Sequence, residues 1–460
     1  MSKVITDWKP EDPTFWKEKG RLIANRNLWI SVPALLLAFV VWQLWSVIVV
    51  FLPRVGFHYT QDQLMMLTAL PALSGATLRI FYAFMVPIVG GRRWTVISTA
   101  SLLIPLIGFG ICVQNPNTSF TTMAILALLC GFGGANFSSS MSNIGYFFPK
   151  SEKGSATGIN AGLGNLGVPV VQFVVPWIIG VGIFGAIGGA PQIWSHDGVQ
   201  KLYWLQNAAY IWVIPVVIMI ICAWFCMNDL SSAKASFSDQ AIIFKRPDNW
   251  LMCWLYLGAF GSFIGFSAAL PLLIKREFPE VDPLSYAFLG PLLGSIFRVV
   301  GGTLSDKFGG ERMTLLSFIG IIICVFCVLF FLPGEGHPGS FIGFLMSFLF
   351  LFTFVGLANG STFAQVPGIF LRYHQKRASQ SSQFSTQNAI KESGAVLGFM
   401  GAIGAYGGFL IPKFFGYSIT HYGSINFAFY CLIGFYVSCV VINWFFYLRK
   451  GSETSASNAK

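Results

Sequence analysis

The chain has 460 residues, of which 55% are hydrophobic and only 10% are charged, and its mean hydropathy is +0.66. Soluble domains carry roughly 25% charged residues, so this composition excludes a water-soluble multidomain enzyme. The formal net charge of +11 raises the question of nucleic-acid binding, but the basic residues lie in short segments between long apolar runs. We therefore expect one polytopic helical membrane protein, whose partner is the lipid bilayer and not a nucleic acid.

A membrane-spanning helix needs about 20 mostly apolar residues, and twelve runs in the sequence have this length. The predicted spans lie near residues 28–52, 64–89, 94–114, 119–147, 155–184, 202–227, 250–274, 284–304, 312–332, 339–370, 394–420 and 424–447. The sequence thus predicts five parts: a cytoplasmic segment 1–27, a six-helix half 28–227, a cytoplasmic linker 228–249, a second six-helix half 250–447 and a cytoplasmic tail 448–460.

The basic residues are distributed unevenly around these spans. Of the 29 lysines and arginines, 22 lie on the side of the chain termini. Four lie on the opposite side, namely Arg54, Lys201, Lys275 and Arg276. Three lie within apolar runs, namely Arg79, Arg298 and Lys413. Because cytoplasmic loops of membrane proteins are enriched in Lys and Arg, we expect both termini in the cytoplasm.

The cations within apolar runs are candidate functional residues, since a charge at the bilayer centre costs about 2.5–3.5 kcal/mol on insertion scales. All 18 acidic residues and all five histidines map to loops, tails or helix ends, so we expect no carboxylate to neutralise Arg79 or Arg298. For Lys413, a structural role is favoured over anion attraction or a position at the interface. The nine cysteines lie in or beside apolar runs, which predicts packing roles and no metal or cofactor.

Arg79 and Arg298 occupy equivalent positions in an internal repeat. Each follows a glycine by four residues, Gly75 or Gly294, and each precedes a Gly-Gly pair by eleven. In transporters built from repeats, substrate sites lie near the membrane midplane between the repeats. We therefore expect both arginines to face one central cavity.

The fifth and eleventh spans are both rich in glycine. The fifth contains Gly158, Gly162, Gly164, Asn165 and Gly167, and the eleventh contains Gly398, Gly401, Gly404, Gly407 and Gly408. Glycine lets helices approach closely and leaves backbone dipoles accessible to a ligand. We expect both roles, with sliding of these helices during transport.

The second half contains a loop similar to a motif of the major facilitator superfamily, Gly302-x-x-x-Asp306-Lys307-x-Gly309-Gly310-x-Arg312. This resemblance implies that Gly302, Asp306 and Arg312 form a cytoplasmic gate. In the first half Pro87 stands in the place of Asp306, so the resemblance does not carry the charge contacts of the motif to that half.

More specifically, the chain resembles the bacterial nitrate/nitrite porter family across nearly its whole length. The resemblance rests on separated segments in the same order, at 26–31, 85–94, 162–167, 256–266 and 404–416. It implies an all-α major facilitator fold of two pseudo-symmetric six-helix halves in the bacterial inner membrane. It also implies a nitrate site in which two phenylalanines clamp the anion, with these members: Arg79, Arg298, Phe137, Phe260, Asn165 and Tyr256.

Physical chemistry supports this assignment, because a guanidinium can pair two nitrate oxygens at once. An anion that neutralises buried arginines lets the loaded carrier change between its two states more easily than the empty carrier. This favours exchange, in which nitrate is imported and nitrite is exported. We expect the carrier to function as a monomer. Proton-coupled nitrate uptake remains an alternative, because the resemblance covers such members. An anion channel or a membrane redox enzyme is favoured less.

Overall fold

The computed structural model describes residues 4–196, 199–231, 233, 241–334, 336, 338–376 and 382–449. Within these residues, 12 helices are long and apolar enough to cross a membrane, and the expected number of spans is therefore confirmed. Some residues of the predicted parts lie outside the described ones: 1–3 of the amino-terminal segment, 232 and 234–240 of the linker, and 450–460 of the tail.

The chain folds into two compact units. The first comprises Met1–Ala235 and Ser267–Phe288, and the second comprises Ser236–Phe266 and Leu289–Lys460. The seventh span, which the sequence assigns entirely to the second half, is thus divided between the units. Inside the first unit, the buried Gln172 side chain donates Nε2 hydrogen bonds to Ser46 Oγ at 3.1 Å and to the Ser267 carbonyl at 2.7 Å.

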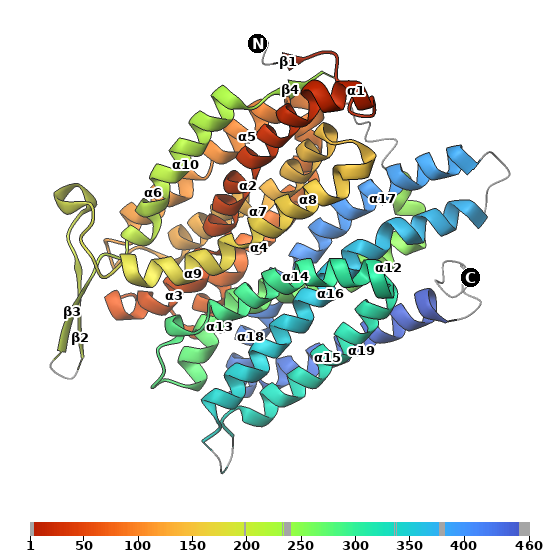
Figure 1. Ribbon diagram of the computed structural model, residues 1–460. Helices are drawn as coiled ribbons and strands as arrows, with labels where there is room; N and C mark the ends of the chain where they lie inside the picture. Colours follow the sequence, from red (N-terminus) through yellow and green to blue (C-terminus); the bar gives the residue numbers. More distant parts are fainter. Residues whose placement is uncertain are drawn as a thin grey trace. The chain divides into compact units, whose positions relative to one another are not determined.

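The first unit contains most of the helices drawn from red to yellow-green in Figure 1. They are α1 (Pro13–Phe15), α2 (Arg21–Gln43), α3 (Trp45–Phe51), α4 (Gln61–Val89), α5 (Gly91–Ala100), α6 (Leu103–Cys112), α7 (Phe120–Phe147), α8 (Lys150–Asn165), α9 (Gly167–Ile178), α10 (Asn207–Cys226) and most of α13 (Ser262–Glu277). The unit also has one π-helix, Trp16–Gly20, and three 3-10 helices, Leu52–Val55, Gly185–Gly188 and Pro283–Ser285.

The second unit contains the remaining helices, which are drawn from green to blue. They are α12 (Pro247–Tyr256), α14 (Leu289–Phe308), α15 (Gly310–Phe331), α16 (Phe341–Lys376), α17 (Ser382–Ala405), α18 (Gly407–Tyr422) and α19 (Asn426–Asn443). It also has two π-helices, Leu257–Gly261 and Trp444–Leu448, and the 3-10 helix Ala241–Lys245.

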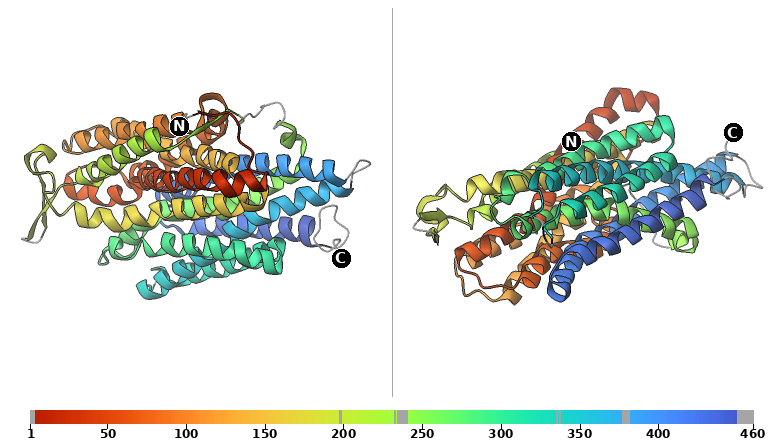
Figure 2. Two further views of the ribbon diagram at one scale, coloured as in Figure 1. Left: turned by 45° about the horizontal axis from the view of Figure 1, so that its top comes forward. Right: turned by 90° about the horizontal axis from the view of Figure 1, so that it is seen from below.

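The described strands form two small sheets, both in the first unit. Strand β1 (Val4–Ile5) pairs in parallel with β4 (Asp229–Leu230). Strands β2 (Gln192–His196) and β3 (Val199–Tyr203) form an antiparallel hairpin that projects beyond the ends of the neighbouring helices (Figure 2). The first sheet joins the amino-terminal segment to the chain that leaves α10.

The amino-terminal segment is folded, whereas the sequence suggested a polar segment before a span at residue 28. The Asp12 side chain accepts hydrogen bonds from the backbone of Thr14 and Phe15, and this cap starts a helix that continues into α2. Trp8 is buried and packs edge-to-face on Phe15 and Phe147. The charged residues between these aromatic anchors hid the helix start at Pro13 from a search for apolar runs.

Each of the two glycine-rich spans is divided into two helices, and in each the second helix begins at a glycine. Helix α8 ends at Asn165 and α9 begins at Gly167, while α17 ends at Ala405 and α18 begins at Gly407. A Cβ at Gly167 would lie 2.2 Å from the Leu36 carbonyl oxygen, and one at Gly407 would lie 2.3 Å from Gly261 Cα. Close backbone packing therefore requires glycine at both positions.

Candidate anion-binding site

Arg79 lies within α4 and is only 1% exposed. Its Nε donates a hydrogen bond to the Gly134 carbonyl at 2.8 Å. The guanidinium carbon lies 5.0 Å from the ring centroid of Trp42 on α2 and 4.8 Å from that of Phe137 on α7. Two aromatic faces thus stabilise a buried cation. The structure brings together Arg79 and Phe137, both named by the family resemblance, and adds Trp42.

Two glycines make room for the Trp42 side chain. A Cβ at Gly75 would lie 2.9 Å from Trp42 Nε1, and one at Gly134 would lie 2.4 Å from the indole ring. Nε1 donates a hydrogen bond to the Pro71 carbonyl at 2.8 Å. The repeated glycine four residues before Arg79 is therefore explained by the indole that packs on it.

Arg298 occupies the matching position in α14 and is 6% exposed. Its Nη2 donates to the Tyr256 hydroxyl at 3.3 Å, and its guanidinium carbon lies 5.8 Å from the ring centroids of both Phe260 and Phe363. The rings of Tyr256 and Phe260 are stacked, with centroids 5.5 Å apart and planes at 16°. Three predicted site residues thus lie together, and Phe363 on α16 joins them.

Asn165 is fully buried at the end of α8. Within the described part of the chain, neither its Nδ2 nor its Oδ1 has a hydrogen-bond partner. The adjacent Gly164 packs on Leu35 of α2, where a Cβ would lie 2.7 Å from the leucine side chain. An amide without a protein partner is able to bind a ligand, but a nitrate contact for Asn165 stays a prediction. Likewise, the expected common cavity of Arg79 and Arg298 stays a prediction, because they lie in different units.

The sequence offered little indication that Trp42 and Phe363 lie beside the two buried arginines. Trp42 and Phe363 are two of 14 tryptophans and 46 phenylalanines, and neither stands in a motif that was used for the site. The short match of Ala38-Phe39 with Ala259-Phe260 marks corresponding turns of the first and seventh spans, and Trp42 follows one turn later. That match was the available clue to an aromatic residue beside Arg79.

The glycines of the fifth and eleventh spans differ in their surroundings. Gly162 and Gly408 are buried. A Cβ at Gly404 would lie 2.8 Å from the Tyr256 ring, so this glycine packs directly on a predicted site residue. Lys413 is half-buried in α18 beside Pro412, and its structural role stays a prediction.

The charged residues of the second-half loop motif differ in burial and in ion pairing. Asp306 and Arg312 are exposed, and with the residues that the structure describes they form no ion pair or hydrogen bond. The neighbouring Glu311 is buried instead, where it pairs with Arg372 and accepts a hydrogen bond at its carbonyl oxygen from Asn443 at 2.8 Å. A Cβ at Gly302 would meet open space. A gating role for Gly302, Asp306 and Arg312 stays a prediction.

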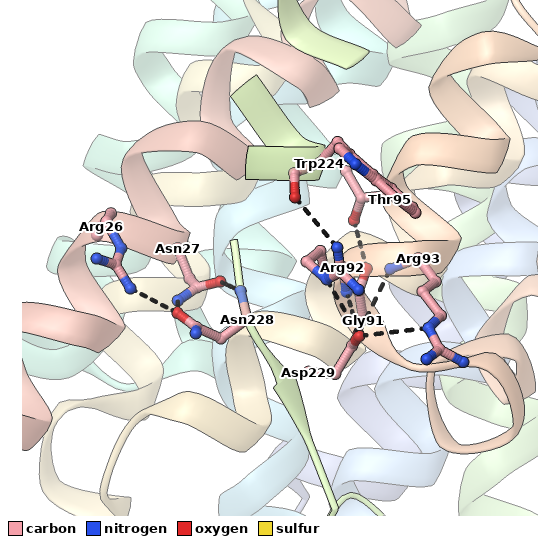
Figure 3. Close-up of polar contacts among 9 residues, drawn as sticks. All are labelled: Arg26, Asn27, Gly91, Arg92, Arg93, Thr95, Trp224, Asn228 and Asp229. Carbon is pink, nitrogen blue, oxygen red and sulfur yellow. Dashed lines mark hydrogen bonds and ion pairs between the residues drawn. The ribbon is translucent and has the colours of Figure 1, made fainter. Parts of the chain in front are cut away.

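In the first half, Asp229 supplies the carboxylate that the loop motif lacks (Figure 3). Its Oδ1 accepts hydrogen bonds from the backbone N–H groups of Arg92 at 2.8 Å and Arg93 at 3.4 Å, and its Oδ2 accepts one from Arg92 Nε at 3.2 Å. A carboxylate is stabilised here because α5 begins at Gly91 and a helix N-terminus carries partial positive charge. A Cβ at Gly90, where φ is +99°, would lie 2.6 Å from Oδ1.

The preceding residue, Asn228, binds the first span (Figure 3). Its Oδ1 accepts hydrogen bonds from Arg26 Nη2 at 2.6 Å and Asn27 Nδ2 at 3.3 Å, and its backbone N–H donates to Asn27 Oδ1 at 2.9 Å. The start of the predicted linker is therefore fixed to α2 and α5. Sequence analysis missed Asp229 because it lies 137 residues from Arg92, in a stretch assigned as a connector.

The end of the predicted linker is fixed within the second unit. Arg246 donates from Nε and Nη2 to the two Glu392 carboxylate oxygens, at 2.9 and 2.8 Å, and from Nη1 to the Tyr373 hydroxyl at 2.6 Å. These hydrogen bonds to the Glu392 carboxylate raise the pKa of Arg246 above its ordinary value. The pair is bidentate, which is the strongest geometry for an arginine and a carboxylate.

Comparison with known sequences agrees with this architecture. The sequence profile of the Major Facilitator Superfamily matches residues 34–391. The chain belongs to this superfamily. It is 51% identical over 454 residues to the nitrate/nitrite transporter NarU of Escherichia coli (strain K12), covering 97% of this chain and 96% of NarU. It is 42% identical over 454 residues to the probable nitrate/nitrite antiporter NarK2 of Thermus thermophilus, covering 98% and 97%.

Solved structures of the Major Facilitator Superfamily share the fold. The xylose transporter XylE from E. coli, in a partially occluded inward-open conformation, matches with a TM-score of 0.65 and 14% identity over 93% of this chain and 99% of that chain. A D-xylose-proton symporter matches with a TM-score of 0.64 and 15% identity, over 94% of this chain and 100% of that chain. These structures confirm the predicted fold. The chain is a multi-pass membrane transporter and not an enzyme, and its resemblance to the nitrate/nitrite porter family is confirmed by NarU and NarK2.

Proposed function

We propose that this protein is a secondary transporter that imports nitrate in exchange for nitrite by alternating access. The observation that carries the proposal is the matched placement of Arg79 and Arg298, one in each unit, each buried among aromatic rings. The substrates named for NarU and NarK2 support nitrate and nitrite as the transported anions.

The two arginine environments suit a small planar anion. A guanidinium offers coplanar N–H donors that pair with two oxygens of nitrate or nitrite. The rings of Phe137 and Phe260 lie beside these donors and can cover the faces of the anion. The Tyr256 hydroxyl and the Asn165 amide add polar groups that fix its orientation.

Exchange follows from the charge balance of such a site. A bound anion lowers the cost of burying the positive charges of Arg79 and Arg298. The loaded carrier therefore changes state more easily than the empty one. Return of the site then requires a second anion, which makes obligatory exchange of nitrate for nitrite electroneutral.

The proposal includes the cellular setting. The distribution of basic residues supports cytoplasmic termini in a bacterial inner membrane. Each unit contains its own arginine and aromatic rings, so one chain carries all the predicted site residues. We therefore propose that the monomer is functional.

Transport into liposomes tests this proposal. Labelled nitrate uptake is measured into vesicles loaded with nitrite and into vesicles without it, each with and without an imposed pH gradient. The proposal predicts uptake that requires internal nitrite and does not respond to the pH gradient. Uptake into nitrite-free vesicles that follows the pH gradient would show proton symport, and uptake that neither saturates nor shows counterflow would show a channel.

A further inference from the structure

We propose that Trp42 is a positioning residue, whose indole ring holds the Arg79 guanidinium in the orientation that binds the anion. This inference rests on the proposed function, because it assigns Trp42 a role through Arg79. It extends the predicted site to α2, from which sequence analysis selected no site residue.

The indole is fixed on the helix that carries Arg79. Trp42 is 1% exposed, and its Nε1 donates to the carbonyl of Pro71 at 2.8 Å. Pro71 lies on α4, about two helical turns before Arg79. Helix α4 thus accepts the hydrogen bond from the indole N–H and also carries the guanidinium that packs on the indole face. The positions of the ring and the cation are therefore coupled through one helix.

Backbone packing leaves the ring little freedom to move. Gly75 on α4 and Gly134 on α7 both approach the indole so closely that a Cβ at either position would lie less than 3 Å from it, at 2.9 and 2.4 Å. The Gly134 carbonyl also accepts the Arg79 Nε hydrogen bond. Gly134 therefore contacts both the Trp42 ring and the Arg79 side chain. A displacement of the indole would shift the position of the guanidinium.

In the second unit, the glycine at the matching position packs on a phenylalanine. A Cβ at Gly294 would lie 2.8 Å from the Phe263 ring, as one at Gly75 would meet Trp42. Phe263 packs on Phe260, with ring centroids 6.4 Å apart and planes at 21°. The guanidinium carbon of Arg298 lies 5.8 Å from the ring centroids of Phe260 and Phe363, compared with 4.8 and 5.0 Å from Arg79 to Phe137 and Trp42. The Arg79 guanidinium thus lies closer to the Trp42 and Phe137 rings than the Arg298 guanidinium lies to the Phe260 and Phe363 rings.

A preorganised guanidinium binds an anion without the cost of ordering a long side chain. Trp42 therefore contributes to affinity while remaining outside the hydrogen bonds to the anion. Loss of this preorganisation should lower nitrate affinity roughly tenfold, which corresponds to about 1.4 kcal/mol.

The test compares nitrate counterflow in purified, reconstituted Trp42→Leu, Trp42→Phe and a control, Trp45→Leu. Trp45 is equally buried on α3, where its ring packs on Phe109. We expect Trp42→Leu to raise the KM for nitrate roughly tenfold with Vmax within about twofold of the parent. Trp42→Phe keeps a ring under the guanidinium and should restore most of the affinity, and Trp45→Leu should leave KM unchanged.

A folded Trp42→Leu protein with the parental KM would overturn the inference, as would an equal rise in KM for Trp45→Leu. If Trp42→Leu does not fold, Trp42→Met, which keeps bulk without a ring, is judged by the same KM. Arg79→Lys separates this inference from the proposed function. Parental nitrate affinity in Arg79→Lys would contradict the arginine assignment itself, whereas an impaired Arg79→Lys beside an unaffected Trp42→Leu would contradict only the role of Trp42.

Discussion

The Asp229 carboxylate binds Arg92 twice, through the backbone N–H at 2.8 Å and through the guanidinium Nε at 3.2 Å. Both residues are buried, at 5% and 4% exposure. Asp229 thus satisfies the first turn of α5 and neutralises a buried cation with one side chain.

Asp229→Ala should therefore destabilise the protein. Removal of one partner of a buried ion pair costs about 3–5 kcal/mol, because the other charge stays buried. Thermal unfolding in detergent measures this loss as a lower Tm. The exposed Asp306 provides the control, since Asp306→Ala should leave Tm unchanged. The second substitution Arg92→Leu should restore part of the stability of Asp229→Ala, and equal Tm values for the parent and Asp229→Ala would contradict this account.

Arg79→Lys and Arg298→Lys should each weaken nitrate binding more than about tenfold, although the charge is kept. Lysine cannot pair two oxygens in one plane or pack flat on an aromatic face as arginine does. Equilibrium binding of labelled nitrate to purified protein measures the effect. Arg54, which lies outside the predicted site in the 3-10 helix Leu52–Val55, is the matched control, and Arg54→Lys should bind nitrate normally. Near-normal affinity in either site variant would argue against bidentate recognition.

Tyr256→Phe should have a smaller effect than Arg298→Lys. It removes the hydroxyl that accepts the Arg298 Nη2 hydrogen bond but keeps the ring that stacks on Phe260. This hydrogen bond is long, at 3.3 Å, and the guanidinium is kept, so we expect nitrate affinity to fall by about two- to tenfold, which corresponds to about 0.4–1.4 kcal/mol. Binding titrations of both variants under one set of conditions test this order, and a reversed order would be inconsistent with a role through Arg298.

Phe260→Ala should weaken nitrate binding with normal expression, because the ring covers one face of the proposed site. Phe399, which packs on Phe244 and Trp250 and is not a predicted site residue, gives a control in the same unit. Phe399→Ala should keep the parental affinity. If Phe260→Ala binds nitrate as the parent does, the ring serves packing alone.

Gly407→Ala should impair folding, whereas Gly398→Ala should not. A Cβ at Gly407 would lie 2.3 Å from Gly261 Cα, a backbone atom that cannot turn aside, but a Cβ at Gly398 would meet nothing within 4 Å. Alanine in an exposed helix interior is about 1 kcal/mol more favourable than glycine, so Gly398→Ala should raise Tm slightly. Tm and yield of monodisperse protein measure both effects, and similar Tm values for the two variants would refute the packing argument.

The sequence predicted those features that depend on local pattern. The length of the apolar runs indicated twelve spans, and Arg79 and Arg298 stood out because they are charges inside such runs. Features that depend on tertiary packing were missed. Trp42 looks like any other aromatic residue of a membrane helix until α4 brings Arg79 onto its face. Asp229 looks like a connector residue until the chain brings it to the start of α5. The helix start at Pro13 was hidden because its apolar contacts are spread among charged residues.

The assignment of Ser267–Phe288 to the first unit has a consequence for fragment complementation. If the protein is expressed as two polypeptides that are cut in the linker, the carboxy-terminal fragment carries residues 267–288 and the amino-terminal fragment carries Gln172. The Gln172 amide then has no Ser267 carbonyl to bind until the second fragment is inserted beside it. Reassembly would thus resemble the exchange of an element in a domain-swapped dimer more than the docking of two finished bodies, and the order in which the fragments enter the membrane should affect the yield.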